Sequence, residues 1–417
     1  MRKTARMLLI ALVGALLLAA QAPTPDETKR FEAIKARHDR GEPVTAEERE
    51  FAMRYMQGQK QQASPPTAEE GRRFQAIKAK RQRGEPLTPE EEQFARQMLQ
   101  RQPQQQQPPQ QNFAEYIKAH PPRESTGLVP LPDFGKGTYQ GEQGGLYPDG
   151  QNTPPAAHLK AGLALARAIA PLDAEGRKAE SGKIVLLSIG MSNTTQEFQA
   201  FQKLAGGDQD LNPRLAIVDG AQGGQAAEIT ANPQANFWKV VDERIAKAGV
   251  TAKQVQAVWL KQANIRPTQE FPANAKKLQG DVVATLHNLA ARFPNLKIAY
   301  LSGRTYGGYA ASPLNPEPHA YESGFAMKWV IAEQIAGKAE LNYDAAKGEV
   351  RSPWVAWGPY LWTDGIKGRQ DGFTYARDDF GPDGTHPSTS GREKVARLLL
   401  TFLKNDPTSR PWFLAKP

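Results

Sequence analysis

Three residues that together can cleave an ester lie far apart in this 417-residue chain. Ser192 stands in the run Gly-Met-Ser-Asn-Thr-Thr, and Asp383 and His386 stand in the run Asp-Gly-Thr-His-Pro. A serine hydroxyl is a weak nucleophile, so a histidine must take its proton and a carboxylate must orient that histidine. The three residues predict acyl transfer, with Ser192 as nucleophile, His386 as general base and Asp383 as its partner. A Ser-Asn-Thr-Thr run is also typical of a helix N-cap, which is the alternative interpretation of Ser192.

Two further segments carry groups that can stabilise the oxyanion of such a reaction. Gly223 lies in the run Asp-Gly-Ala-Gln-Gly-Gly-Gln, and Asn264 ends the run Lys-Gln-Ala-Asn. We predict an oxyanion hole from the backbone N–H groups of Gly223 and Ser192 together with the side-chain amide of Asn264. Gly220 and Gly224 remain alternatives to Gly223, and an ordinary glycine-rich turn without a catalytic role is the other interpretation of this segment.

The elements that must position these residues follow from the hydrophobic pattern. Apolar, β-branched runs predict strands at residues 183–189, 214–218, 256–260, 297–301 and 354–357. Helical periodicity between them predicts helices at residues 197–204, 237–248 and 278–293. Strands that alternate with helices indicate a mainly parallel sheet covered on both faces, a three-layer α/β/α sandwich. Because ligands bind beyond the carboxyl ends of such strands, the candidate residues should meet at one edge of the sheet.

The motifs and their order resemble the SGNH (GDSL-like) hydrolase superfamily, and within it the carbohydrate-esterase, sialate O-acetylesterase-like branch. The resemblance covers roughly residues 180–405 and rests on Ser192, Gly223, Asn264, Asp383 and His386. Two blocks depart from the usual pattern: Gly-Met-Ser-Asn replaces Gly-Asp-Ser, and Lys-Gln-Ala-Asn replaces Gly-x-Asn-Asp. The resemblance implies a flavodoxin-like SGNH fold and a carboxylic ester hydrolase that needs neither a metal nor an organic cofactor.

Loops between these blocks are expected to hold the substrate. Arg304 and Tyr306 lie in the loop at residues 302–309, and Trp357 ends the last predicted strand. Aromatic side chains stack on sugar rings, and polar side chains pair with sugar hydroxyls, so we predict a small-molecule or polysaccharide ester, most plausibly an O-acetylated one. Aromatic residues in loops also simply cap a sheet. The alternatives are a lipid, thioester or aryl ester substrate, or a non-catalytic envelope or glycan-binding protein.

The first segment of the chain predicts export. Arg2, Lys3 and Arg6 precede an apolar run at residues 7–20 that ends in small residues, as in a signal peptide. This run is shorter than the about 20 residues that span a membrane, so we assign residues 1–22 to a cleaved signal peptide. We therefore expect a periplasmic or extracellular protein without stable membrane insertion after cleavage. An uncleaved membrane anchor is the alternative.

An internal repeat follows the signal segment. Residues from 30 and from 73 match closely at a constant offset of 43, and Thr45-x-x-Glu48 and Thr88-x-x-Glu91 are typical of capping boxes. The predicted organisation is a helical hairpin at 27–58, a second at 69–100, a Gln/Pro-rich linker at 101–112 and a hydrolase-like domain at 113–417. The hairpins are candidates for binding an envelope partner, and a solvated charged spacer is the alternative.

Composition excludes several other classes of chemistry. The sequence contains no cysteine, which excludes disulfides, thiolate zinc sites, iron–sulfur clusters and a cysteine nucleophile. The net charge of +9 is small for this length and includes the basic residues of the signal segment, so we expect no nucleic-acid partner.

Overall fold

The computed structural model describes residues 113–416 without a gap. N-terminal to these it describes only residues 30, 31, 33, 34, 37, 45, 47, 48, 51, 70, 73, 74, 77, 80, 88 and 90–94. The predicted signal peptide and linker therefore lie outside the described residues. The chain divides into two units, Met1–Gln110 and Gln111–Pro417, and each is described by itself.

The second unit is built on a five-stranded parallel sheet. Its strands are β3 (Ile184–Gly190), β4 (Leu215–Asp219), β5 (Val255–Lys261), β6 (Ile298–Ser302) and β7 (Trp354–Trp357), in the order β4-β3-β5-β6-β7. All four neighbouring pairs are parallel. Every predicted strand is confirmed within one or two residues, because strands covered on both faces are continuous apolar runs.

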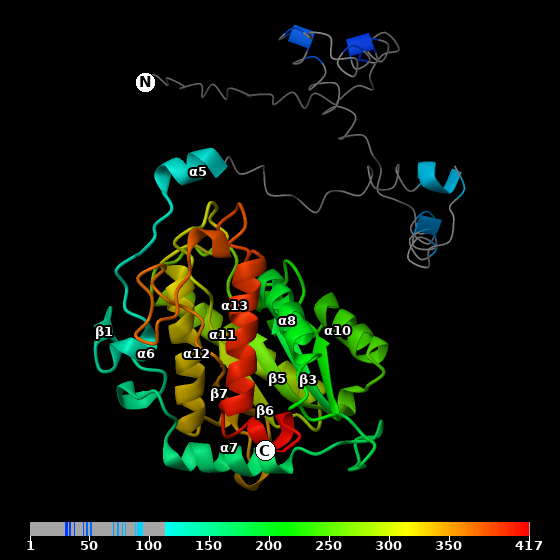
Figure 1. Ribbon diagram of the computed structural model, residues 1–417, viewed down its shortest axis with the longest axis vertical. Coiled ribbons are helices and arrows are strands. Elements are labelled where there is room, and N and C mark those ends of the chain that lie inside the picture. Colours follow the sequence, from blue (N-terminus) through cyan, green and yellow to red (C-terminus); the bar gives the residue numbers. More distant parts are fainter. Residues whose placement is uncertain are drawn as a thin grey trace, which may run out of the picture. The chain divides into compact units, whose positions relative to one another are not determined.

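Helices cover both faces of the sheet and complete the predicted three-layer α/β/α sandwich (Figure 1). α8 (Ser192–Ala205) packs against α13 (Thr389–Asn405), and α11 (Ala273–Arg292) packs against α12 (His319–Ile335). Further helices are α5 (Phe113–Ala119), α6 (Leu131–Phe134), α7 (Ala156–Ala168), α9 (Ala227–Ala231), α10 (Asn236–Lys247) and α14 (Arg410–Phe413). Two short strands, β1 (Thr138–Tyr139) and β2 (Glu142–Gln143), form an antiparallel pair.

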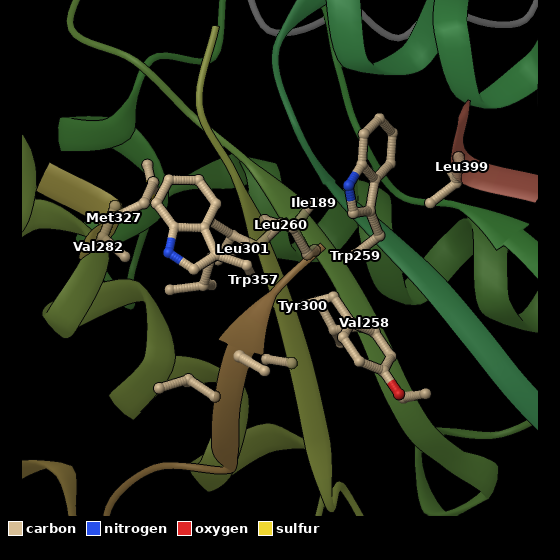
Figure 2. Packing of buried hydrophobic residues seen from close by; sticks show 14 of the residues in the cluster. Ile189, Val258, Trp259, Leu260, Val282, Tyr300, Leu301, Met327, Trp357 and Leu399 are labelled. Atoms are coloured by element: carbon tan, nitrogen blue, oxygen red, sulfur yellow. The ribbon is translucent and has the colours of Figure 1, made fainter. Parts of the chain in front are cut away.

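The hydrophobic core joins the sheet to these helices. Figure 2 shows part of this cluster, with Val258, Trp259 and Leu260 of β5 among its members. Successive strand residues point to opposite faces, so Trp259 points away from Val258 and Leu260. Trp259 stacks on Phe198 of α8 with ring centroids 5.8 Å apart, which fixes α8 against the centre of the sheet.

The described residues of the first unit repeat the same contacts in both copies. The Glu48 N–H donates to Thr45 Oγ1 at 3.2 Å, and the Thr45 N–H donates to the Glu48 carboxylate at 2.9 Å. Thr88 and Glu91 make the same pair of bonds at 3.0 and 3.2 Å, so both predicted capping boxes are confirmed. The two-hairpin organisation itself stays a prediction.

Aromatic packing is repeated in the same way. The guanidinium of Arg30 lies 4.4 Å from the ring centroid of Phe51, and Arg73 lies 4.4 Å from that of Phe94.

Within the described part of the chain, no helix is both long enough and apolar enough to cross a bilayer.

Candidate functional site

Ser192 is the first residue of α8, directly beyond the carboxyl end of β3. The turn between them requires glycine at position 190. A Cβ there would lie 2.3 Å from the Lys261 carbonyl oxygen and 2.3 Å from Thr194 Oγ1. The glycine therefore lets α8 start immediately beside β5, which holds Ser192 over the carboxyl edge of the sheet.

The structure brings Ser192, His386 and Asp383 together, although Ser192 and His386 are separated by 194 positions. Ser192 Oγ lies 2.8 Å from His386 Nε2, and His386 Nδ1 lies 2.5 Å from Asp383 Oδ2. An ionised carboxylate only accepts hydrogen bonds, so Nδ1 carries the proton of a neutral imidazole. Nε2 is then free to accept the Ser192 hydroxyl, as a general base must.

Asp383 is held in its charged form. Burial raises the pKa of its carboxyl, but the His386 side chain and the backbone N–H groups of His386 and Thr385 donate to it. These hydrogen bonds prevail and lower the pKa of Asp383 from 3.8 to about 2. The side chains of His386 and Asp383 are 32% and 29% exposed, so the imidazole is still open to a ligand.

The loop that carries Asp383 and His386 is fastened to its surroundings. Asn193 Nδ2 donates to the Thr385 carbonyl at 2.9 Å, which joins this loop to the first turn of α8. Ala311 N–H donates to the Asp383 carbonyl at 2.8 Å. Gly384 has a φ of +63°, and a Cβ there would lie 1.7 Å from the Tyr309 carbonyl oxygen. These contacts fix the backbone on both sides of the imidazole.

Two backbone N–H groups can serve as oxyanion donors. Gly223 lies beside the nucleophile, since a Cβ built on it would be 3.9 Å from Ser192 Cβ. Within residues 113–416, neither the Gly223 nor the Ser192 backbone N–H has a protein acceptor. The alternative Gly220 is less suited, because its N–H donates to Ser188 Oγ at 3.2 Å. Gly224 has a φ of +73° and sets the turn that follows Gly223.

The side-chain donors of Asn264 are already engaged within the protein. Its Nδ2 donates to the Asn274 carbonyl at 2.9 Å and to Asn274 Oδ1 at 2.8 Å. Both N–H bonds are thereby used, and Asn264 Oδ1 is buried without a partner. The predicted oxyanion role of Asn264 is therefore corrected. Its backbone carbonyl instead accepts from Asn315 Nδ2 at 3.1 Å.

Two of the three predicted substrate residues are packed into the core. Tyr306 is 1% exposed, and its hydroxyl donates to the Arg123 carbonyl at 2.7 Å. Trp357 is 3% exposed, and its Nε1 donates to the Leu146 carbonyl at 2.6 Å. Neither ring has a free face for a sugar, so both predictions are replaced by a packing role. The third residue, Arg304, retains unpaired donors, which are described below.

A buried ion pair beneath α8 was not predicted. Lys261 Nζ lies 2.6 and 2.5 Å from the two carboxylate oxygens of Glu197, and both side chains are almost fully buried. Burial lowers the pKa of Lys261 to about 8, against the opposing effect of Glu197. Thr194 Oγ1 adds a bond of 2.8 Å to the Lys261 carbonyl, so the first turns of α8 are fastened to the end of β5. The lysine that directly follows the apolar run predicted as a strand at residues 256–260 was the signal that could have revealed this pair.

Comparison with known proteins leaves the family open. No family model matches the chain, and no curated protein matches it. Among solved structures, protein YXIM from Bacillus subtilis is 14% identical with a TM-score of 0.31, over 55% of this chain and 59% of that one. The chain thus spans less than two thirds of that structure's length.

Two further solved structures are similar to the same degree. The periplasmic domain of a lipopolysaccharide acetyltransferase from Salmonella ser. Paratyphi A is 13% identical with a TM-score of 0.31, over 53% of this chain and 84% of that one. A protein named as a candidate platelet activating factor from Streptococcus pneumonia is 14% identical with a TM-score of 0.28, over 59% and 92%. TM-scores below 0.5 carry no argument, so the fold assignment rests on the strand order itself.

Proposed function

We propose that this protein is an exported serine esterase of SGNH type that removes O-acetyl groups from a carbohydrate. The observation that carries the proposal is the hydrogen-bonded series of Ser192, His386 and Asp383 at the carboxyl edge of a parallel sheet. A serine, a histidine with one free ring nitrogen and an ionised carboxylate are the groups that acyl transfer requires.

The reaction proceeds through an acyl-enzyme. Ser192 Oγ attacks the ester carbonyl while His386 Nε2 takes the hydroxyl proton, and the oxyanion forms beside the Ser192 and Gly223 N–H groups. The imidazolium returns this proton to the departing alcohol as the ester C–O bond breaks. Water then attacks the acyl carbon while His386 Nε2 takes its proton. The bond between the acyl carbon and Ser192 Oγ breaks, the imidazolium returns the proton to Oγ, and the carboxylic acid leaves.

The other parts of the proposal have separate support. Export rests on the signal-like run at residues 1–22. The choice of a carbohydrate ester rests on the sequence resemblance to carbohydrate esterases, because the burial of Tyr306 and Trp357 removes the aromatic argument.

Hydrolysis of p-nitrophenyl acetate and of acetylated oligosaccharides by purified protein tests the proposal. We expect Ser192→Ala to lose hydrolysis by at least about 10³-fold, because removing the nucleophile leaves only binding and the oxyanion hole. Ser181→Ala, in an exposed turn, is the matched control and should keep full activity. Equal hydrolysis by wild type and Ser192→Ala would exclude the serine mechanism. A folded wild type that cleaves no ester would favour a binding protein.

A further inference from the structure

Arg304 is a buried cation without a carboxylate partner. It lies two residues beyond the end of β6 and is only 5% exposed. None of the ion pairs formed within the described residues includes it, whereas buried Lys261 is paired with Glu197. Arginine is almost never buried unless it is paired, because an uncompensated buried charge costs stability. Such a residue indicates a missing anion.

The contacts of Arg304 use only one of the side-chain nitrogen atoms. Nε donates to Asn315 Oδ1 at 3.1 Å, and Asn315 in turn donates to the Asn264 carbonyl. Across residues 113–416, neither terminal Nη atom has an acceptor, and neither is among the fully buried atoms that lack a partner. The small exposed part of Arg304 is therefore its unpaired tip, at the carboxyl edge of the sheet that also holds Ser192.

Three carboxylates act on Arg304 from a distance, but none of them forms an ion pair with it. Burial lowers the pKa of Arg304, while the carboxylates of Glu197, Glu317 and Asp383 raise it from a distance. An arginine guanidinium still stays charged at neutral pH. Glu197 is paired with Lys261, and Asp383 is hydrogen-bonded to His386. The carboxylate of Glu317 accepts from the Trp362 side chain and from the backbone N–H groups of Gly307 and Tyr321.

A second arginine lies in the segment that follows β5 and also contains Asn264. Arg266 is exposed, and its backbone has a φ of +49°, a conformation that its N–H holds by donating to the Leu314 carbonyl at 2.9 Å. The preceding residue, Ile265, packs against the small cluster that contains Met191, the neighbour of Ser192. Arg266 is therefore one residue away from a side chain that packs beside the catalytic serine.

We infer that Arg304 binds a carboxylate of the ester substrate through the N–H fork of its guanidinium, with Arg266 adding positive charge at the rim. This inference rests on the proposed function and narrows it: the substrate is an O-acetylated acidic sugar, such as a uronic acid. A guanidinium presents two parallel N–H donors to one carboxylate, which gives both strength and orientation.

Binding of an unesterified sugar tests the inference without any catalytic step. Isothermal titration of wild type with glucuronate and with the neutral glucuronamide should give at least about tenfold tighter binding of glucuronate, as for a charged hydrogen bond. Arg304→Met should abolish this preference, and Arg351→Met, at an exposed arginine paired with Glu349, should keep it. Equal affinity for the two sugars, or binding of neither, would overturn the inference whether or not the protein is an esterase.

Turnover then shows which part of the substrate carries the charge. The ratio of kcat/KM for O-acetyl glucuronate over O-acetyl glucuronamide should exceed about tenfold in wild type and approach one in Arg304→Met. A preference for mono-p-nitrophenyl succinate over p-nitrophenyl butyrate, lost in the same variant, would place the carboxylate on the acyl side instead. A ratio unchanged by Arg304→Met would contradict the inference.

Two further variants keep the test interpretable if Arg304→Met folds poorly. Arg304→Lys keeps the charge but loses the fork, so the preference for glucuronate should fall only in part. Arg266→Gly tolerates the positive φ and removes the rim charge, so it should weaken binding of glucuronate more than that of glucuronamide. A thermal unfolding midpoint of Arg304→Met equal to or above that of wild type would support a role of Arg304 in binding. Failure of Arg304→Met to fold, together with an unaltered preference for glucuronate in Arg304→Lys and Arg266→Gly, would indicate a structural role.

Discussion

Asp383 fixes the proton of the His386 imidazole on Nδ1, because its Oδ2 accepts the Nδ1–H and its Oδ1 accepts two backbone N–H groups. A carboxylate with a pKa of about 2 stays ionised at any pH at which the protein would work. The residue therefore fixes the tautomer and stabilises the imidazolium without exchanging a proton itself.

Replacing this carboxylate by an amide tests that role. We expect Asp383→Asn to lower kcat by about 10³- to 10⁴-fold, because the amide can donate to Nδ1 and stabilise the wrong tautomer. Steady-state hydrolysis of p-nitrophenyl acetate measures the change, and exposed Asp378→Asn is the control. A loss below about tenfold would mean that Asp383 does not fix the tautomer of His386.

At the scale of elements, α8 is held over β5 by the buried pair of Glu197 and Lys261. Glu197→Gln leaves the Lys261 charge without compensation and should destabilise the protein by about 3–5 kcal/mol, measured by urea unfolding. The double variant Glu197→Leu with Lys261→Met should recover most of that loss, because it removes both charges. A double variant no more stable than Glu197→Gln would contradict the pairing.

The turn from β3 to α8 allows a second test with a matched control. Gly190→Ala places a methyl against Lys261 and Thr194 and should cost at least about 1–3 kcal/mol while displacing Ser192. Gly280→Ala lies inside α11, where a Cβ meets no atom within 4 Å, and should stabilise by about 0.5–1 kcal/mol. Thermal unfolding compares the stability of the two variants. Equal changes in stability would show that the close contacts of Gly190 are not what makes its substitution destabilising.

Some features of the fold and of the site could be predicted from the sequence, and others could not. The strands and the positions of Ser192, Asp383 and His386 could be predicted, because apolar runs and loop motifs are local signals. The hydrogen-bond partners of Asn264 and Tyr306 could not be predicted. They are Asn274 and Arg123, which lie in segments without a recognisable sequence motif. α12 (His319–Ile335) was not among the predicted helices, because it is buried on most of its surface and lacks a single apolar face.

For the whole molecule, the buried carboxyl of Glu317 couples stability to pH. Burial raises its pKa from 4.5 to about 7, although Trp362 and the backbone N–H groups of Gly307 and Tyr321 donate to it and favour the ionised form. The folded state thus binds a proton more tightly than the unfolded state. Its contribution to stability is present below about pH 4.5 and is lost as the pH rises toward 7.

Unfolding by urea between pH 4.5 and pH 7.5 checks this coupling. Glu317→Gln has no titratable group at this position, so its free energy of unfolding should fall less across that range than that of wild type. A pH dependence identical in the two proteins would show that Glu317 has an ordinary pKa in the fold.

The central claim is that His386 and Asp383 activate Ser192 as a nucleophile. Incubation of the purified protein with a fluorophosphonate, followed by mass spectrometry of its peptides, tests this claim without knowledge of the substrate. We expect about one phosphonyl group per chain, located on Ser192 and absent from His386→Ala. An unlabelled folded protein, or a label on another serine, would contradict it.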